Sequence, residues 1–375
     1  MPRSPDFIQL SLISKPKKKL MKIVNIILSS QNGGAEQVFI DYLMILKKLN
    51  HELLAITKED APYKDAVASL GVELKTITNH FGYHDFFAIK KIRKILEEFK
   101  ADAVIAHVGR SVVLVRKSIG DNKKIKLIAV NHSTNVKRSI GADIILSVNK
   151  EIFFKTIDKG QNAQASFIID NAVDVEDAIN DAPQIDLVQK NKITIGAMGR
   201  LEKCKGFHVL LMALAKLDKK FHLKIAGSGV EEKNLKEQVR VLGLQDRVEF
   251  CGWIKDKKNF FTSFDIFCMP SIDIANETFG LVLLEAMKYR TPIICCNADG
   301  PRDVVRDEID GLIFDVRHDN EQKMAAEIVK KMQRLTQEKG LANRLIENSF
   351  LRLIERFSYP ALEKKLSEIF GRIKK

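Results

Sequence analysis

The chain of 375 residues is long enough for two domains of ordinary size, each with its own core. Hydrophobic residues make up 45% and charged residues 29%, which excludes a disordered or fibrous protein, and no run approaches the 18 or so apolar residues of a membrane-spanning helix. The net charge of +13 is concentrated in residues 1–170, where 27 Lys+Arg face 17 Asp+Glu. This excess suggests an anionic partner or a merely lysine-rich soluble surface, and without an RNA- or DNA-binding signature nucleic acid is not expected.

The first 20 residues do not resemble a signal peptide, because the basic run Lys15–Lys19 follows the short apolar stretch instead of preceding a longer one. We interpret residues 1–20 as a disordered arm or as an extension ahead of a start at Met21. The five cysteines are odd in number and form no C-x-x-C pair. We therefore expect a cytoplasmic protein in a reducing compartment, with no structural zinc.

Strand-like runs alternate with helical stretches throughout, which is typical of parallel α/β sheets. The runs are short and almost continuously apolar, as strands buried on both faces should be. The expected strands of the first half are Lys22–Ser30, Glu52–Thr57, Val72–Thr78, Ala103–Val108, Ile125–His132, Ile144–Val148 and Ser166–Ile169. Those of the second half are Ile193–Met198, Leu223–Ala226, Val248–Cys251, Ile266–Met269, Ile293–Cys296 and Leu312–Phe314.

Helices are expected between the strands, for example over Ala35–Leu49 and Phe86–Phe99, and from Asp319 to the end with a break near residue 358. We predict two doubly wound, Rossmann-like domains that face each other, over residues 21–174 and 192–356, joined by a polar linker at 175–191. Sheets of this kind bind ligands beyond the carboxyl ends of their strands.

The first candidate site in chain order is the loop with Gly33 and Gly34, which follows the first strand and precedes a helix. Two glycines let the backbone approach a bound group, and the helix start favours an anion, although an ordinary flexible turn has the same pattern. His107 and His132 each end a predicted strand, where sites form in this fold. A single histidine at such a position is as often a hydrogen-bonded structural residue as a functional one.

In the second half, Gly199-Arg200-Leu201 follows a strand and Lys205-Gly206 opens the next helix. Arg200 and Lys205 offer a planar fork and a point charge to a diphosphate, and fixed cations stabilise the charge that builds up when a glycosyl–phosphate bond breaks. The later turn Gly227-Ser228-Gly229 lacks the third glycine of a dinucleotide fingerprint, and Glu232 stands in its place. A dehydrogenase is thus disfavoured, and the turn is expected either to pack or to lie near the base of the nucleotide.

The most informative stretch contains Glu277 and Glu285, eight residues apart across the point where a loop becomes an apolar helix. A helix that begins near Phe279 would direct its first free amides and positive dipole end toward a diphosphate. These amides belong to Gly280, Leu281 and Val282. Eight helical residues rise roughly 12 Å, so the carboxylates are too distant to share a proton but can bracket a sugar nucleotide. The alternative is that Glu277 caps a core helix and Glu285 faces solvent.

Taken together, these motifs resemble the GT-B glycosyltransferases of family four. The resemblance rests on Gly199-Arg200-Leu201 with Lys205-Gly206, the pair Glu277 and Glu285, Asn171-Ala172-Val173-Asp174, Gly33-Gly34 and Arg356-Phe357-Ser358-Tyr359. It covers residues 21–373. Two departures stand out: Ala172 replaces the usual glycine of N-G-[VI]-D, and Asp299-Gly300-Pro301-Arg302-Asp303 has lost one glycine of G-G-x-x-E and shortened its acid.

The resemblance implies a retaining, metal-independent transfer from a nucleotide sugar, with no cofactor. By it, Arg200 and Lys205 hold the diphosphate, Glu285 the ribose, and Glu277 positions the donor sugar, while Gly34 approaches the phosphates and His132 lies against the sugar. The leaving phosphate is expected to accept the acceptor proton. The first domain is expected to bind the acceptor, the second the nucleotide sugar, and the helix at 357–375 to cross back to the first domain.

The resemblance also implies a glycan or lipid-linked acceptor of the cell envelope, of lipopolysaccharide type, reached from the cytoplasmic side. The basic amphipathic stretch Phe86–Leu96 suits an anionic membrane surface, or is a covering helix with a solvated basic face. Three other functions stay open: a sugar-nucleotide epimerase that uses His107 and His132, a two-lobed solute-binding protein, and a catalytically inactive sugar-nucleotide binder.

Overall fold

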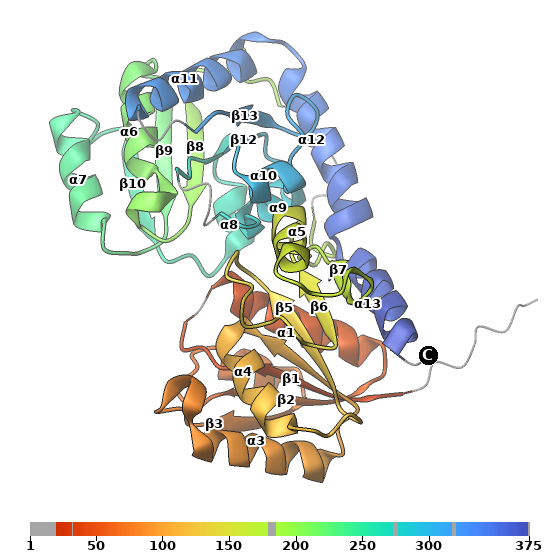
Figure 1. The fold of residues 1–375 in the computed structure, drawn as a ribbon. Helices are drawn as coiled ribbons and strands as arrows, with labels where there is room; N and C mark the ends of the chain where they lie inside the picture. The colour runs from red at the N-terminus through yellow and green to blue at the C-terminus, as the bar shows by residue number, and fades with distance from the viewer. Residues whose placement is uncertain (1–19, 32, 179–184, 273–276, 317–319, 374–375) are drawn as a thin grey trace, which may run out of the picture.

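The structure is a computed structural model that describes residues 20–31, 33–178, 185–272, 277–316 and 320–373. Two parallel sheets, each flanked by helices, form two domains that are stacked along the long axis of the molecule (Figure 1). The predicted α/β class with two doubly wound sheets is confirmed. Every predicted strand is present, most with bounds within one or two residues of those expected.

The first sheet has seven strands in the order β3-β2-β1-β4-β5-β6-β7, and all its pairs are parallel. Its strands are β1 Lys22–Ile27, β2 Glu52–Lys58, β3 Glu73–Ile77, β4 Ala103–His107, β5 Lys126–Asn131, β6 Ile144–Ser147 and β7 Ser166–Ile168. Its helices are α1 Gly34–Lys48, α2 Lys64–Ser69, α3 Phe86–Phe99, α4 Val108–Ile119 and α5 Lys150–Asp158, with short 3₁₀ turns at Gly82–His84 and Ala163–Ala165. The strand order reverses between β1 and β4, the place where such sheets bind ligands.

The second sheet has six parallel strands in the order β10-β9-β8-β11-β12-β13, and its order reverses between β8 and β11. Its strands are β8 Ile193–Met198, β9 Phe221–Ala226, β10 Val248–Gly252, β11 Ile266–Met269, β12 Ile293–Cys296 and β13 Leu312–Phe314. Its helices are α6 Phe207–Lys216, α7 Glu232–Val241, α8 Lys257–Phe261, α9 Leu281–Lys288, α10 Asp299–Val304, α11 Glu321–Gln337 and α12 Leu341–Arg352, with a 3₁₀ turn at Lys203–Lys205.

The C-terminal region departs from the expected single helical stretch in one respect. The chain breaks not only near residue 358 but also after Gln337, where Gly340 adopts φ 80° and precedes α12. Gly340 is the N-cap of α12, and glycine adopts this left-handed conformation readily because it has no side chain to oppose it. A π-helical turn over Leu353–Phe357 then leads to the last helix, α13 Tyr359–Ile373.

Helix α13 leaves the second domain and packs on α1 of the first (Figure 1). Leu362, Leu366 and Phe370 lie in the same apolar cluster as core residues of the first domain. Apolar burial therefore joins the end of the chain to the domain with which it began.

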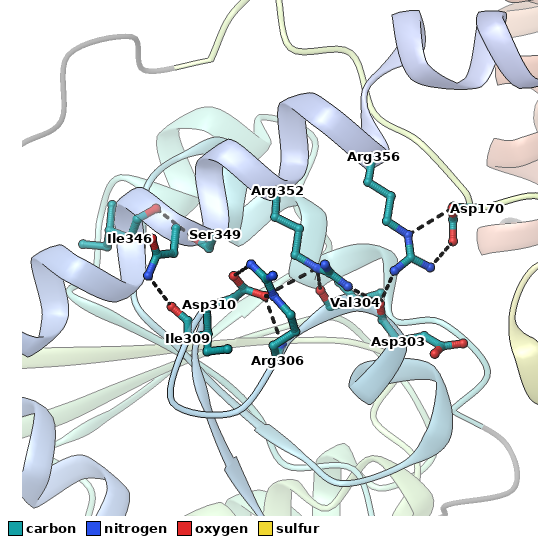
Figure 2. A network of polar contacts seen from close by, with 11 residues as sticks. Asp170, Asp303, Val304, Arg306, Ile309, Asp310, Ile346, Ser349, Arg352 and Arg356 are labelled. Carbon is teal, nitrogen blue, oxygen red and sulfur yellow. Dashed lines mark hydrogen bonds and ion pairs between the residues drawn. The ribbon is translucent and has the colours of Figure 1, made fainter.

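A polar network crosses the same junction (Figure 2). The Arg356 guanidinium donates to both oxygens of Asp170, just after β7, at 2.8 and 3.2 Å, and Lys365 of α13 pairs with the same carboxylate. Burial alone would raise the pKa of Asp170, but the two cations outweigh it and hold the pKa below its usual range. Arg352 donates to the carbonyl oxygens of Asp303 and Val304, which ties the network to α10.

Candidate active site

The loop after β8 brings the two predicted cations to the edge of the second sheet. The Lys205 ammonium lies 2.7 Å from Glu277 Oε2, and the Ser271 hydroxyl donates to the same oxygen at 2.6 Å. Ser271 follows β11, so residues from both sides of the strand-order reversal meet at one carboxylate. The structure thus unites a predicted diphosphate-binding lysine with the predicted sugar-positioning acid.

Arg200 is placed differently from Lys205. Its guanidinium pairs with Glu202 at 2.5 Å, and 64% of the side chain is exposed. The loop that carries it is fixed by the backbone of the neighbouring turn, because Leu201 N donates to Ser228 O at 2.8 Å. The turn Gly227-Ser228-Gly229 therefore packs against the cationic loop, which is one of the two roles expected of it.

Helix α9 begins at Leu281, two residues later than the predicted start near Phe279. Gly280 is the N-cap and adopts φ 87°, so the chain turns into the helix through a left-handed residue. The amides of Leu281 and Val282 lie in the first turn, where no intrahelical acceptor exists. The anion-favouring end of the helix still follows closely after Glu277 in the sequence.

The glycine loop of the first domain meets this helix start. A Cβ atom added at Gly34 would lie 3.1 Å from the Leu281 side chain, and Leu281 packs against the core of the first domain. The predicted phosphate-approaching glycine and the predicted anion-binding turn are therefore neighbours, although they lie far apart in the sequence.

Glu285 lies on the second turn of α9 and is buried, not solvent-facing. Its carboxylate pairs with Lys257 at the start of α8, at 2.6 Å. Sequence reasoning missed Lys257, because it stands in a lysine-rich run without a distinguishing pattern. Two cations, Lys205 and Lys257, thus each hold one of the two predicted carboxylates.

A buried carboxyl of α1 lies near Glu285 and was also missed. Asp41 accepts hydrogen bonds from the Tyr359 hydroxyl at 2.7 Å and from the Gln37 amide at 2.9 Å. Burial raises the pKa of Asp41 to about 7, against the effect of those two donors, and the Glu285 charge adds to the rise. The Tyr359 contact explains why the segment Arg356–Tyr359 sits at the domain junction.

His107 and His132 lie at the carboxyl ends of β4 and β5, as predicted, and they contact each other. His107 Nδ1 is 3.0 Å from His132 Nε2, and the rings stack at 17°. The His132 carbonyl accepts from the Thr278 hydroxyl at 2.9 Å, next to Glu277. Burial lowers the pKa of His132 to about 4 and also lowers that of His107, so both rings are neutral near pH 7.

The segment that departs from the family pattern still packs against the site. A Cβ atom at Gly300 would lie 2.4 Å from the Glu277 carbonyl oxygen, so only glycine fits there. Asp303 accepts from the Lys150 amide of α5 at 3.0 Å, and Asn149 donates to the Thr278 carbonyl at 2.6 Å. The shortened acid, Asp303, therefore joins the two domains.

The other departure from the family pattern is Ala172. It is buried, and its neighbour Val173 forms a β-bridge with Ser358.

Within the described part of the chain, no group of three or more His, Cys, Asp or Glu side chains is arranged to hold a metal ion. Among the helices that the structure describes, none combines the length and apolarity needed to cross a bilayer.

Comparison with known proteins finds a family match for the second domain. Residues 179–352 match the family model of glycosyl transferases group 1. The lipopolysaccharide core biosynthesis glycosyltransferase LpsE of Rhizobium meliloti is 24% identical over 332 residues, which cover 88% of this chain and 94% of that protein.

Two solved structures share the fold. Anabaena Alr3699/HepE in complex with UDP and glucose has a TM-score of 0.79 at 20% identity, covering 94% of this chain and 99% of that chain. The apo form of the lipopolysaccharide outer core galactosyltransferase WaaB has a TM-score of 0.75 at 18% identity, with the same coverage. Two Rossmann-like domains whose carboxyl edges meet around these side chains define an enzyme of the GT-B architecture. Residues 179–352 form a glycosyl transferases group 1 domain, and the chain is a glycosyltransferase.

Proposed function

We propose that this glycosyltransferase moves a hexose from a nucleoside diphosphate sugar to an envelope glycan or lipid-linked acceptor of lipopolysaccharide type, with retention at the anomeric carbon and without a metal ion. The names of its relatives support the acceptor class, since LpsE acts in lipopolysaccharide core biosynthesis. The HepE structures with UDP and with UDP-glucose support the donor class.

The observation that carries the proposal is that residues of both domains lie together at one site. In the second domain, Lys205 pairs with Glu277. From the first domain, Gly34 lies against Leu281 at the start of α9, and the His132 carbonyl accepts from Thr278. A diphosphate at this junction would face the Lys205 ammonium and the amides of Leu281 and Val282. These fixed positive groups need no reorganisation as charge develops on the leaving group, so they stabilise the transition state more than the ground state.

In the proposed reaction, the bond between the anomeric carbon and the β-phosphate oxygen breaks while the acceptor oxygen forms a bond to the same face of that carbon. The acceptor hydroxyl gives its proton to an oxygen of the departing phosphate, so the nucleoside diphosphate leaves with the bonding electron pair. We assign to Glu277 the positioning of the sugar, to Glu285 a hydrogen bond with the ribose, and to Arg200 a second contact with the diphosphate.

The test is incubation with UDP-glucose, UDP-N-acetylglucosamine and GDP-mannose, with detection of the free nucleoside diphosphate. Lys205→Met should lower its release by roughly 10²-fold or more, the usual cost of removing one stabilising charge. Lys203→Met is the matched control, because Lys203 is exposed in the same 3₁₀ turn. Equal rates for the two variants would refute the phosphate assignment.

Further arms of this experiment address the finer parts of the proposal. Release should persist in EDTA, and the anomeric coupling of the glycosylated product should match that of the donor. An epimerase would instead convert one sugar nucleotide into another without releasing the diphosphate, and a non-catalytic binder would do neither.

We place the enzyme at the inner face of the cytoplasmic membrane, docked through the N-terminal end of α3. The apolar face of α3 is used in the core, where Ile92 and Leu96 are buried, so it is not available to lipid. Three aromatic rings remain outside: Phe81, Phe86 and Phe87 are 67%, 67% and 73% exposed. Exposed lysines of the same helix supply positive charge beside them.

Co-sedimentation with vesicles tests this placement. Full-length protein should pellet with phosphatidylglycerol vesicles at low salt and not with phosphatidylcholine vesicles. The double change Phe86→Ser and Phe87→Ser should reduce pelleting several-fold. Phe154→Ser, at an exposed phenylalanine of α5, is the control and should have no effect. Equal pelleting of both variants would refute docking through α3.

A further inference from the structure

A chain of hydrogen bonds runs from the core of the first domain to His132. Asn25 of β1 donates its side-chain amide to the Phe39 carbonyl at 3.0 Å, and its Oδ1 lies 3.0 Å from His107 Nε2. His107 Nδ1 lies 3.0 Å from His132 Nε2. Asn25 and His107 are fully buried, whereas His132 is partly exposed.

The chain has a single direction that follows from its first member. A carbonyl oxygen can only accept, so the atom of Asn25 that faces Phe39 is the NH₂ group and the atom that faces His107 is Oδ1. Since Oδ1 also only accepts, His107 must carry its proton on Nε2. A neutral His107 then has a bare Nδ1, which accepts, and the proton between the two rings belongs to His132 Nε2.

The same logic fixes the second ring nitrogen of His132. With a proton on Nε2, neutral His132 has a lone pair on Nδ1, which has no hydrogen-bond partner among the residues that the structure describes. The carbonyl of the same residue accepts from Thr278, so the ring stands beside the Glu277 loop.

The surroundings preserve this arrangement near neutral pH. The rings of Phe39 and Tyr42, both on α1, stand edge-on to His107 at 5.7 and 5.2 Å. Among the described residues, the titratable groups in contact with the His107 ring are His132 and Tyr42. Burial raises the pKa of Tyr42, so its hydroxyl stays protonated. Burial lowers the pKa of both histidines, so neither ring takes up a proton between about pH 6 and 8.

We propose that Asn25 and His107 are positioning residues that hold His132 with its proton on Nε2, so that His132 Nδ1 accepts a hydrogen bond from a hydroxyl of the donor sugar. The inference rests on the proposed function, since it requires a sugar at this junction. If Asn25 and His107 had only a structural role, they would not determine whether His132 Nδ1 donates or accepts a hydrogen bond.

Nitrogen NMR of the full-length protein with ¹⁵N-labelled histidine tests the proton positions without any assay of activity. His132→Asn identifies the His132 signals. We expect a protonated Nε2 and a bare Nδ1 on His132 from about pH 6 to 8, and a shift of the Nδ1 signal when UDP-glucose is added. A proton on His132 Nδ1 in the wild type would overturn the proposal, and so would an Nδ1 signal that ignores bound UDP-glucose.

The variant Asn25→Asp is expected to reverse the direction of the hydrogen bond between His107 and His132. Its carboxylate still accepts from His107 Nε2, but it favours the doubly protonated ring, which then donates from Nδ1 to His132 and forces the His132 proton onto Nδ1. The ratio of variant activity to wild-type activity, measured at each pH, should then be roughly tenfold lower at about pH 6 than at about pH 8. This is about the effect of one lost hydrogen bond to the substrate. A loss that is the same at both pH values, with His132 signals unchanged, would mean a structural role.

His51→Asn is the control, because His51 is a partly buried histidine of the same domain, at the other end of the sheet's strands. It should change stability without changing the His132 signals. If the Asn25→Asp variant does not fold, the wild-type spectra alone decide the proposal. If the wild type shows the expected protons but turns over no nucleotide sugar, the proposed function fails while the hydrogen-bond chain stands.

Discussion

Lys205 and Glu277 form an ion pair of 2.7 Å at the junction of the two domains. The groups that we expect to bind the diphosphate and the sugar of the donor therefore neutralise each other, and the Ser271 hydroxyl contacts the same carboxylate. A donor that enters this site must share the Lys205 ammonium with Glu277. Glu277 therefore competes with the diphosphate for Lys205 and limits how tightly the diphosphate is bound. The same carboxylate lies where we expect the sugar.

The first prediction follows from this sharing. Glu277→Gln keeps the hydrogen bond from Ser271 but removes the charge that competes for Lys205. UDP should bind as well as to the wild type or up to roughly tenfold more tightly, while turnover falls by about 10²-fold because the sugar is no longer positioned. Calorimetry with UDP and a turnover assay measure the two effects. Weaker UDP binding by the variant would contradict the model, and Glu327→Gln, in a partly exposed pair on α11, is the control.

The second prediction concerns Arg200, whose side chain is mostly exposed and paired only with nearby Glu202 in the described structure. An exposed pair contributes little to stability, so Arg200→Ala should change the free energy of unfolding by less than about 0.5 kcal/mol. Release of nucleoside diphosphate should nevertheless fall at least roughly tenfold, because one contact with the leaving group is lost.

Arg240→Ala is the matched control, since Arg240 is an exposed arginine of α7 paired with Glu237. It should preserve both thermal midpoint and activity. If Arg200→Ala is as active as Arg240→Ala, Arg200 does not contact the diphosphate.

The fold could be predicted because its strands are short, almost continuously apolar runs separated by helical stretches. Such runs as Ile23–Ile27 are buried in the structure, and burial on both faces leaves little place in them for polar residues. The helix boundaries were less accurate. Helix α9 begins after the left-handed Gly280, two residues later than predicted, and the expected C-terminal helical stretch is interrupted before α12, whose N-cap is the left-handed Gly340. The sequence contains both glycines but does not show that each of them directly precedes a helix.

The site could be predicted only where its residues follow strands or form a spaced pair. Lys257, Asp41 and Asn25 were missed because each lies within a helix or strand, in a local sequence typical of an ordinary surface or core. Their partners are distant in sequence: Asn25 is 82 residues from His107, and Asp41 is 318 residues from Tyr359. Pairings over such separations depend on tertiary packing, which local patterns do not encode.

The third prediction concerns Asp170, which joins the first domain to Arg356 and Lys365. Its pKa is lowered, so the ion pairs stabilise the protein above the unfolded-state pKa of about 4, and this contribution is lost as the pH falls through the folded-state pKa. Asp170→Asn should cost about 2–3 kcal/mol at pH 7, less than a fully buried pair because both cations are partly exposed.

Hydrogen exchange locates this loss. The amides of α13 should exchange faster in Asp170→Asn, because the cations that fasten the helix to the first domain lose their carboxylate. Asp299→Asn, in an exposed pair with Arg302, should leave α13 protected. Unchanged exchange in both variants would show that the apolar contacts of α13 hold it without the network.

The last prediction is a pH dependence set by Asp41. Its pKa is about 7 in the folded protein and near 4 when unfolded, so the folded state binds one more proton between these values. Stability from this group is greatest below about pH 4, falls as pH rises to about 7, and stays low above it. Asp41→Asn keeps the acceptor for Tyr359 and Gln37 without the charge. It should therefore match the wild type near pH 4.5 and exceed it near pH 8 by at most about 4 kcal/mol.

Thermal midpoints of both proteins at about pH 4.5, 6 and 8 measure this difference, and other titrating groups cancel in the comparison. Asp121→Asn, at an exposed turn after α4, should show no pH-dependent difference from the wild type. Tyr359 and Glu285 both lie near Asp41. If the difference in thermal midpoint between the variant and the wild type grows with rising pH, the Asp41 charge destabilises the junction of α1, α9 and α13 at neutral pH. A constant gap at all three values would show that Asp41 ionises normally and that the junction tolerates its charge.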